Sequence, residues 1–229
     1  MIIKLSKPVY KKRLKLKKNN KLWKTWVTLQ LINMVFRTKF ILASSSQSRH
    51  SLLKKNNLYF IKTKPICNED FIKKTLLKKK RSPKTISLEL ARTKARSVSL
   101  KTTNILVVGS DTVISIGGLL LDKAKNIKNA KKTLLKMSNK KHAIYSSASA
   151  YYNEKEVWNG TQKTTVKIRK ISQKEADLYL KNVGKKILNS VGCYRLEKEG
   201  PNIIENINGD FFNVMGFPLF PFLVFLKKF

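Results

Sequence analysis

The sequence is poor in acidic residues, histidine and cysteine. Its 229 residues include 13 Asp and Glu against 49 Lys and Arg, which gives a formal net charge of +36 at pH 7. The two histidines, His50 and His142, and the two cysteines, Cys67 and Cys193, lie far apart in the chain and in no metal-ligand spacing. These shortages exclude a zinc site built from Cys and His, and they exclude a disulfide framework. They favour a reducing compartment, so we expect a cytoplasmic protein.

Long uninterrupted apolar runs are also missing. The mildly apolar stretch that begins at Lys21 is broken by Lys24 and Gln30, and the apolar C-terminal stretch contains Pro218 and Pro221. A membrane-spanning helix needs about 20 consecutive apolar residues, so neither stretch predicts one, and we expect no membrane partner. The C-terminal stretch instead predicts a buried strand, a turn and a terminal helix.

The first 33 residues differ in composition from the rest of the chain. They contain ten Lys and Arg and no Asp or Glu. Three interpretations fit: a disordered basic arm, a peripheral anchor, or translated upstream sequence with the true start at Met34. We favour the last, because Met34 comes just before the first well-formed strand pattern. The predicted organisation is an N-terminal extension over residues 1–33 and one domain over residues 34–229.

The basic excess is a feature that proteins binding nucleic acid or acidic membranes share. Here, however, the lysines are spread along the chain rather than confined to one stripe. They also accompany abundant Asn and Ile, a composition that codon bias toward A and T would produce. Nucleic acid is therefore the less favoured partner.

Apolar periodicity predicts strands and helices in irregular alternation. Gly117 and Gly118 separate two short apolar strands and predict a hairpin, and Ser172 predicts a helix N-cap. The predicted strands are 39–44, 58–64, 105–108, 112–116, 119–121, 142–152, 157–168, 191–196 and 203–207. The predicted helices are 47–56, 85–99, 126–137 and 172–180, and residues 68–70 are predicted as a loop. This mixture favours an α/β protein with a mixed sheet over a regular doubly wound fold.

Because acidic residues are scarce, those beside small residues at predicted strand ends are informative. In "VVGSDTV", Asp111 is expected just beyond an apolar strand, with Gly109 and Ser110 leaving room beside it. A carboxylate there can hold a divalent metal or accept a proton from water, although a plain turn aspartate fits this motif equally well. Glu69, in the predicted loop after the second strand, is a candidate metal ligand or water-orienting residue.

Two lysines and one serine-rich turn add candidates for binding an anion. In "LARTKARSV", Lys94 shares the apolar helix face with Ala91 and Ala95, and a lysine in such a groove must find an anion. Lys123 follows the return strand of the hairpin and could reach a phosphate, although alone it fits one more surface lysine. The stretch "ILASSSQSRHSLL" predicts either a simple helix cap or an anion pocket of hydroxyls and free helix N–H groups.

Taken together, the motifs resemble those of the Maf family over about residues 37 to 229. They are "LASSSQSRHSLL", "NE" after the second strand, "LARTKA", "GSDTV", "DKAKN", "SVGCYRLE" and "GDFFNVMGFPL", in the family's order and spacing. The resemblance implies an inosine-triphosphatase-like fold, with an elongated mixed sheet flanked by helices. It implies a nucleoside triphosphate pyrophosphatase that cleaves between the α and β phosphates to give the monophosphate and pyrophosphate. It also implies a divalent cation, Mg²⁺ or Mn²⁺, and often a homodimer.

The resemblance further implies roles for individual residues. Asp111 would accept the proton in the reaction. Glu69 and Lys94 would be the other two catalytic residues. Glu69 and Asp111 would also hold the metal. The positions that match phosphate-binding residues of the family are Ser44, Ser46, Arg49, Lys94 and Lys123.

Departures from the family pattern fall at three places. Ser48 replaces the first of two arginines, Asn68 replaces the aspartate before Glu69, and residues 189–192 replace a lysine-containing motif. The positions expected to set base preference are Ser48, Thr112 and Glu197. Thr112 matches members that prefer thymidine and uridine nucleotides, and Glu197 matches members that prefer a methylated guanosine nucleotide. We lean to a purine or non-standard base, and the alternative is a catalytically degenerate relative with a cell-division or nucleic-acid-binding role.

Overall fold

The computed structural model describes residues 38–229, of which residues 39–229 form one compact unit. The predicted extension over residues 1–33 lies outside the described residues. The strands are β1 (Phe40–Ala43), β2 (Phe60–Thr63), β3 (Leu106–Ile116), β4 (Leu119–Leu121), β5 (Lys141–Tyr152), β6 (Lys155–Ile168) and β7 (Ile204–Asn208). The α-helices are α3 (Gln47–Lys55), α4 (Glu69–Lys78), α5 (Pro83–Ser99), α6 (Ile127–Met137), α7 (Gln173–Val183), α8 (Phe211–Val214) and α9 (Leu219–Leu226). Short 3₁₀ turns follow α7: η1 (Lys185–Asn189), η2 (Val191–Cys193) and η3 (Gly200–Asn202).

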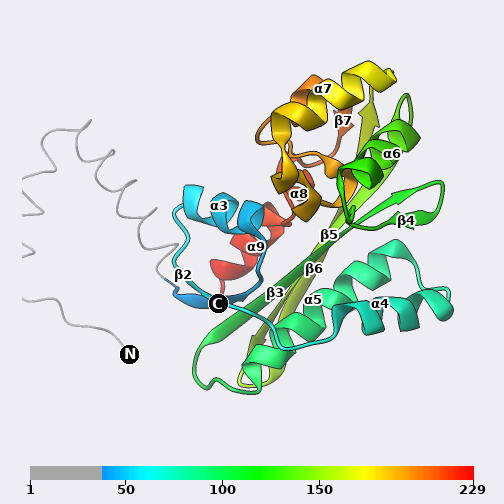
Figure 1. Cartoon of the computed structure of the whole chain (residues 1–229). Helices are drawn as coiled ribbons and strands as arrows, with labels where there is room; N and C mark the ends of the chain where they lie inside the picture. Colours follow the sequence, from blue (N-terminus) through cyan, green and yellow to red (C-terminus); the bar gives the residue numbers. More distant parts are fainter. Residues whose placement is uncertain (1–37) are drawn as a thin grey trace, which may run out of the picture. The chain divides into compact units, whose positions relative to one another are not determined.

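All seven strands belong to one mixed sheet, in the order β2-β1-β3-β5-β6-β7, with β4 paired to β3. The strand β1 is parallel to both β2 and β3, and the pairs β3–β5, β5–β6 and β6–β7 are antiparallel. Figure 1 shows β3, β5 and β6 as the long axis of this unit, with α6 and α7 toward one end. The mixed α/β fold with an elongated sheet is therefore confirmed.

One edge of β3 changes partner along its length, and this positions the candidate site. β1 pairs with residues Leu106 to Gly109 of β3, and β4 pairs with Ile114 to Ile116. Between them, residues 110–113 have no strand partner on that edge within the described part of the chain. Backbone and side chains there are free to meet other groups, and this stretch contains Asp111.

The helix α5 packs against one face of β3 through a close approach at Gly109. A Cβ atom at Gly109 would lie 2.2 Å from the Ala91 carbonyl oxygen and 2.5 Å from the Ala95 amide nitrogen. Because side chains alternate along a strand, Asp111 lies on the same face as Gly109, beneath α5. The glycine thus lets a helix approach the sheet, whereas the sequence suggested that it leaves room beside Asp111.

The other side of the sheet is covered by aromatic side chains. Phe40 of β1 packs edge-to-face on Phe222 of α9, and Phe222 also packs on Phe217 and lies against Trp158 of β6. Phe40, Phe217 and Phe222 are each 0% exposed, and burying such a side chain stabilises the fold by roughly 1.5–3 kcal/mol. A second core, which includes Leu134, joins α6 and α7 to the far end of the sheet.

Most predicted elements are confirmed, and four are wrong in part. β3 is one strand over Leu106–Ile116 instead of two pieces, so Asp111 lies within a strand and not in a turn. Glu69 is the first residue of α4, not a loop residue. The strand predicted over 191–196 is instead a 3₁₀ turn followed by a loop, because Gly192 and Cys193 have positive φ angles. The C-terminal stretch folds as the helices α8 and α9 without the predicted strand. None of the helices within residues 38–229 is long and apolar enough to cross a membrane.

Candidate active site

Lys94 on α5 joins the two carboxylates that the sequence singled out. Its Nζ lies 2.6 Å from Asp111 Oδ1 and 2.7 Å from Glu69 Oε2. The Lys94 side chain is 8% exposed and that of Asp111 13%, whereas Glu69 is 46% exposed. A buried ammonium needs paired anions, so the prediction that Lys94 finds an anion is confirmed.

The catalytic candidate Glu69 is the first residue of the helix α4, which has no fully buried residue. Asn68 is the N-cap of α4, and its Oδ1 accepts from the Phe71 N–H at 3.0 Å. No residue of α4 is buried, and Lys73, one turn after Glu69, pairs with Asp122 before α6. The position of Glu69 therefore depends on this cap, on ion pairs and on the partly buried Ile72 and Leu76, which pack against the cluster of Ile86, Leu90 and Val113.

The serine-rich turn after β1 caps the helix α3. Ser46 is the N-cap of α3, and its Oγ accepts from the Arg49 N–H at 3.4 Å. The Ser46 N–H in turn donates to Ser44 Oγ at 3.2 Å. The helix cap is therefore confirmed, and the anion pocket stays a prediction, which hydroxyls and N–H groups at a helix N-terminus would suit.

Arg49 is buried behind these serines, with 5% of its surface exposed. Its Nε donates to the Gly216 carbonyl at 2.8 Å, its Nη1 to Ser44 Oγ at 2.6 Å, and its Nη2 to Thr112 Oγ1 at 3.3 Å. Burial lowers the pKa of the Arg49 guanidinium, and the negative charges of Asp111 and Glu69 oppose this effect. The carboxylates and the serine turn therefore lie within electrostatic reach of each other.

A buried polar cluster that sequence reasoning missed connects Thr112 to the C-terminal segment. Thr112 Oγ1 lies 2.9 Å from Ser146 Oγ, which donates to the Asn213 carbonyl at 2.8 Å. Asn213 is 0% exposed, and its Oδ1 accepts from the Ser146 N–H at 3.0 Å. The available signal was Asp210, which caps α8 by accepting from the Asn213 N–H, at the i to i+3 spacing of an N-cap.

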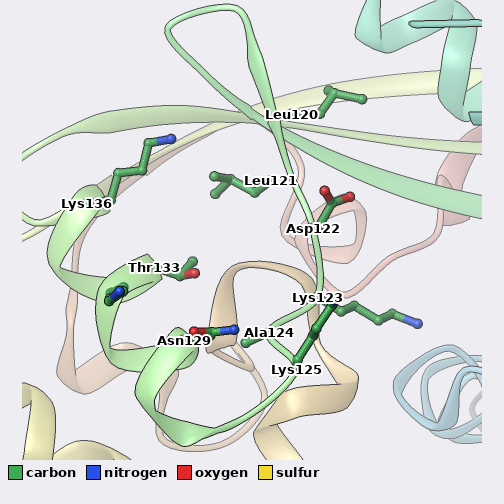
Figure 2. Close-up of a pocket in the computed structure, with 10 residues that line it drawn as sticks. Leu120, Leu121, Asp122, Lys123, Ala124, Lys125, Asn129, Thr133 and Lys136 are labelled. Carbon is green, nitrogen blue, oxygen red and sulfur yellow. The ribbon is translucent and has the colours of Figure 1, made fainter. Parts of the chain in front are cut away.

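Other predicted site residues are not joined to this cluster by a hydrogen bond or ion pair. Lys123 is exposed in the connection between β4 and α6, and Figure 2 shows its side chain extending away from Asn129 and Thr133 of the neighbouring open pocket. Glu197 is half-buried in the loop after η2, and Ser48 is half-buried in the first turn of α3. The roles of these three residues remain predictions.

The donor set fits a divalent cation of the magnesium type. Within residues 38–229 no group of three or more His, Cys, Asp or Glu side chains could hold a metal on its own. Two carboxylates, Glu69 and Asp111, nevertheless converge on one ammonium, and each has a second oxygen. Mg²⁺ is commonly held by one or two carboxylates together with substrate phosphates and water, so this pair fits that mode.

Comparison with known proteins agrees with the motifs. Residues 39–229 match the family described as "Maf: Maf-like protein". The chain is 37% identical over 189 residues to a Bartonella henselae protein named 7-methyl-GTP pyrophosphatase, an alignment that covers 82% of this chain and 94% of the relative. It is 34% identical over 189 residues to a Pelagibacter ubique protein named nucleoside triphosphate pyrophosphatase, with 82% and 97% covered. A Caulobacter vibrioides protein of the same name is 34% identical over 190 residues, with 83% and 95% covered.

Proposed function

The chain belongs to the Maf family, and we propose that it is a nucleoside triphosphate pyrophosphatase that releases a nucleoside monophosphate and pyrophosphate. The observation that carries the proposal is the contact of Lys94 with both Asp111 and Glu69. Asp111 lies where the β3 edge is paired with neither β1 nor β4 within residues 38–229. This contact supports the proposal, because the hydrolysis of a triphosphate needs a base, a cation and a carboxylate that can hold a metal.

Each side chain of this group has a role in such a hydrolysis. Asp111 accepts the proton of a water that attacks the α-phosphorus, while the bond from that phosphorus to the bridging oxygen breaks. Its Oδ1 is held by Lys94, which leaves Oδ2 to face the water. Pyrophosphate leaves with most of the negative charge, which Lys94 and Lys123 would stabilise.

Glu69 and Asp111 would hold Mg²⁺ or Mn²⁺, because they are the two carboxylates that converge on one point. When bound, the cation would neutralise charge on the phosphates and polarise their oxygens. We further propose that the protein acts in the cytoplasm, because its two cysteines, Cys67 and Cys193, are unpaired. We also propose a homodimer, as the family resemblance led us to expect.

A purine or modified purine is the proposed base. Glu197 can accept two hydrogen bonds from the N1–H and amino group of guanine. Thr112, which matches the pyrimidine-preferring members, instead uses its hydroxyl within the cluster with Arg49 and Ser146. The name of the Bartonella henselae relative points the same way.

The test is pyrophosphate release over a panel of standard and modified triphosphates, including GTP, 7-methyl-GTP, TTP and UTP, with Mg²⁺ or Mn²⁺. Asp111→Asn should lower the rate by about 10²- to 10⁴-fold, the range typical of losing a general base. Asp177→Asn is the matched control, because Asp177 pairs with Lys131 on an exposed surface. If no triphosphate is hydrolysed by a folded preparation, the alternative of a catalytically degenerate relative is favoured.

A further inference from the structure

The C-terminal helix α9 presents an apolar face to solvent. Its eight residues, Leu219–Leu226, are all apolar, but only three of them are buried. On another side of the helix, Phe220 and Val224 lie one turn apart and are each 56% exposed. An ordinary surface helix buries one apolar stripe and directs polar side chains to water, as α6 does. The solvent-facing side of α9 is therefore a candidate contact surface.

Aromatic side chains of α8 extend this apolar face. Phe211 is 49% exposed and packs edge-to-face on Phe212, whose ring packs in the same way on Phe220. Figure 1 shows α8 and α9 next to each other in the C-terminal part of the chain. We call Phe211, Phe212, Phe220 and Val224 the C-terminal apolar patch. A contiguous patch of this kind marks a site of contact with another protein or a membrane, whereas single exposed apolar residues are ordinary.

Every charged side chain of this C-terminal segment is positive. Residues 211–229 contain no Asp or Glu, and their two lysines, Lys227 and Lys228, are both exposed. Lys228 follows Val224 by four residues, so it lies near the end of the exposed side of α9. A lysine at the edge of an apolar surface can lay its aliphatic stem along that surface and hold its ammonium at a polar boundary. The patch therefore suits a partner that is apolar inside and negative at its boundary.

These properties favour one kind of partner over two others. Nucleic acid would bring phosphates against the patch, and the side chains of Phe and Val offer no donors to them. A second copy would place the lysines of two identical patches beside each other in a symmetric contact, and no acidic side chain of residues 211–229 could pair with them. An anionic lipid bilayer offers an apolar layer for the rings and negative headgroups for the lysines.

We propose that the C-terminal apolar patch is a contact surface for an anionic lipid bilayer. Its rings enter the boundary between headgroups and acyl chains, while Lys227 and Lys228 reach the phosphates of the lipids. With eight residues, α9 lies along the surface and is too short to cross the bilayer. The sequence led us to expect no membrane partner because it contains no spanning stretch, and that reasoning does not concern contact with the surface. This contact is independent of the proposed hydrolysis.

Binding of the full chain to lipid vesicles tests the proposal. Co-sedimentation compares vesicles that contain phosphatidylglycerol in phosphatidylcholine with vesicles of phosphatidylcholine alone. The wild type should bind the anionic vesicles at least about tenfold more tightly, because each lysine near an anionic surface contributes about fivefold. Phe220→Ser combined with Val224→Ser should weaken this binding by about tenfold or more, through loss of apolar contact. Lys227→Gln combined with Lys228→Gln should weaken it by about tenfold as well.

Matched substitutions outside the patch serve as controls. Leu178→Ser removes a leucine of α7 that is 60% exposed, and Lys128→Gln combined with Lys132→Gln removes two exposed lysines of α6. Both controls should change vesicle binding by less than about threefold, because at physiological ionic strength the effect of a charge is screened over about 8 Å and these side chains do not belong to the patch. Residues 1–33 are present in every variant, so their basic side chains cannot cause a difference between variants.

The proposal is overturned if the wild type binds anionic and neutral vesicles equally, or if the patch variants lose no more binding than the controls. It is also overturned if the wild type binds no vesicles and the paired change of Phe220 and Val224 splits a dimer in sedimentation velocity, because a second copy then covers the patch. RNA binding that the patch variants weaken as strongly as vesicle binding would assign the surface to nucleic acid instead.

Thermal unfolding checks that every variant folds. The substitutions change exposed side chains, so Tm should stay the same as in the wild type. If the pair at Phe220 and Val224 fails to fold, the pair at Lys227 and Lys228 decides the outcome. Because pyrophosphate release is not measured, the vesicle experiment gives the same result whether or not the proposed pyrophosphatase activity is present.

Discussion

Replacing Lys94 by methionine should destabilise the protein and abolish its activity together. The substitution leaves Asp111, with a 13% exposed side chain, without the ammonium at 2.6 Å. Removing one partner of a buried ion pair costs about 3–5 kcal/mol. Glu69 is 46% exposed and adds only about 0–1 kcal/mol. Since Asp111 keeps some contact with water, we expect the free energy of unfolding to fall by about 3 kcal/mol.

For a domain of this size, 1 kcal/mol corresponds to a shift in Tm of about 2–4 °C, so Lys94→Met should lower Tm by about 6–12 °C. The matched control is Lys131→Met, which breaks the exposed pair with Asp177 and should cost at most about 1 kcal/mol. Urea unfolding and pyrophosphate release are measured on both variants. Mn²⁺ should raise the Tm of Lys94→Met, because a dication can replace the lost charge between the carboxylates. Equal stability losses in the two variants would refute this reasoning.

Three further predictions concern His142, Gly109 and Asn68. Burial lowers the pKa of His142 from 6.5 to about 4, so on acidification the unfolded state takes up a proton at this residue before the folded state does. The free energy of unfolding should therefore fall by about 3 kcal/mol as the pH falls from 6.5 toward 4. In urea unfolding across this range, the free energy of unfolding should change less with pH for His142→Phe than for the wild type. Gly109→Ala should cost about 3 kcal/mol or more in urea unfolding, because the new Cβ would lie 2.2 Å from the Ala91 carbonyl oxygen. Asn68→Ala should lower the free energy of unfolding by about 1 kcal/mol, because it removes the cap that accepts from the Phe71 N–H. It should also raise the Mg²⁺ concentration needed for half-maximal activity. Asn68→Asp keeps the cap and should show neither effect.

The long strands and Lys94 could be predicted because their signals are local. Alternating apolar residues over 142–152 and 157–168 identify two half-buried strands, which are β5 and β6. A lysine on the face that also holds Ala91 and Ala95 is conspicuous because nothing else on that face is charged. In both cases the pattern within one element fixes what the element must contact.

The points at which strands break or end were predicted less well, because pairing with distant parts of the chain overrides local turn chemistry. Gly109-Ser110-Asp111 resembles a turn, yet β5 pairs with all of β3 from Leu106 to Ser115 and holds it extended. The apolar run that begins at Val191 resembles a strand, but its positive φ angles at Gly192 and Cys193 end any pairing. The bond from Arg49 to Gly216 spans 167 residues of sequence, and no local pattern indicates it.

The charges of the site explain how it can work without the first arginine of the family motif. Lys94 pairs with Asp111 and Glu69, and Arg49 is a second buried cation whose charge interacts with them, so two cations against two carboxylates leave no net positive charge. A nucleoside triphosphate is strongly anionic, and these side chains alone cannot neutralise it. A divalent cation and neutral donors must supply the rest, and the hydroxyls and N–H groups at the start of α3 are such donors. If the proposed function holds, phosphate contacts from hydroxyls, backbone N–H groups and a metal would let Ser48 stand where the family pattern has an arginine.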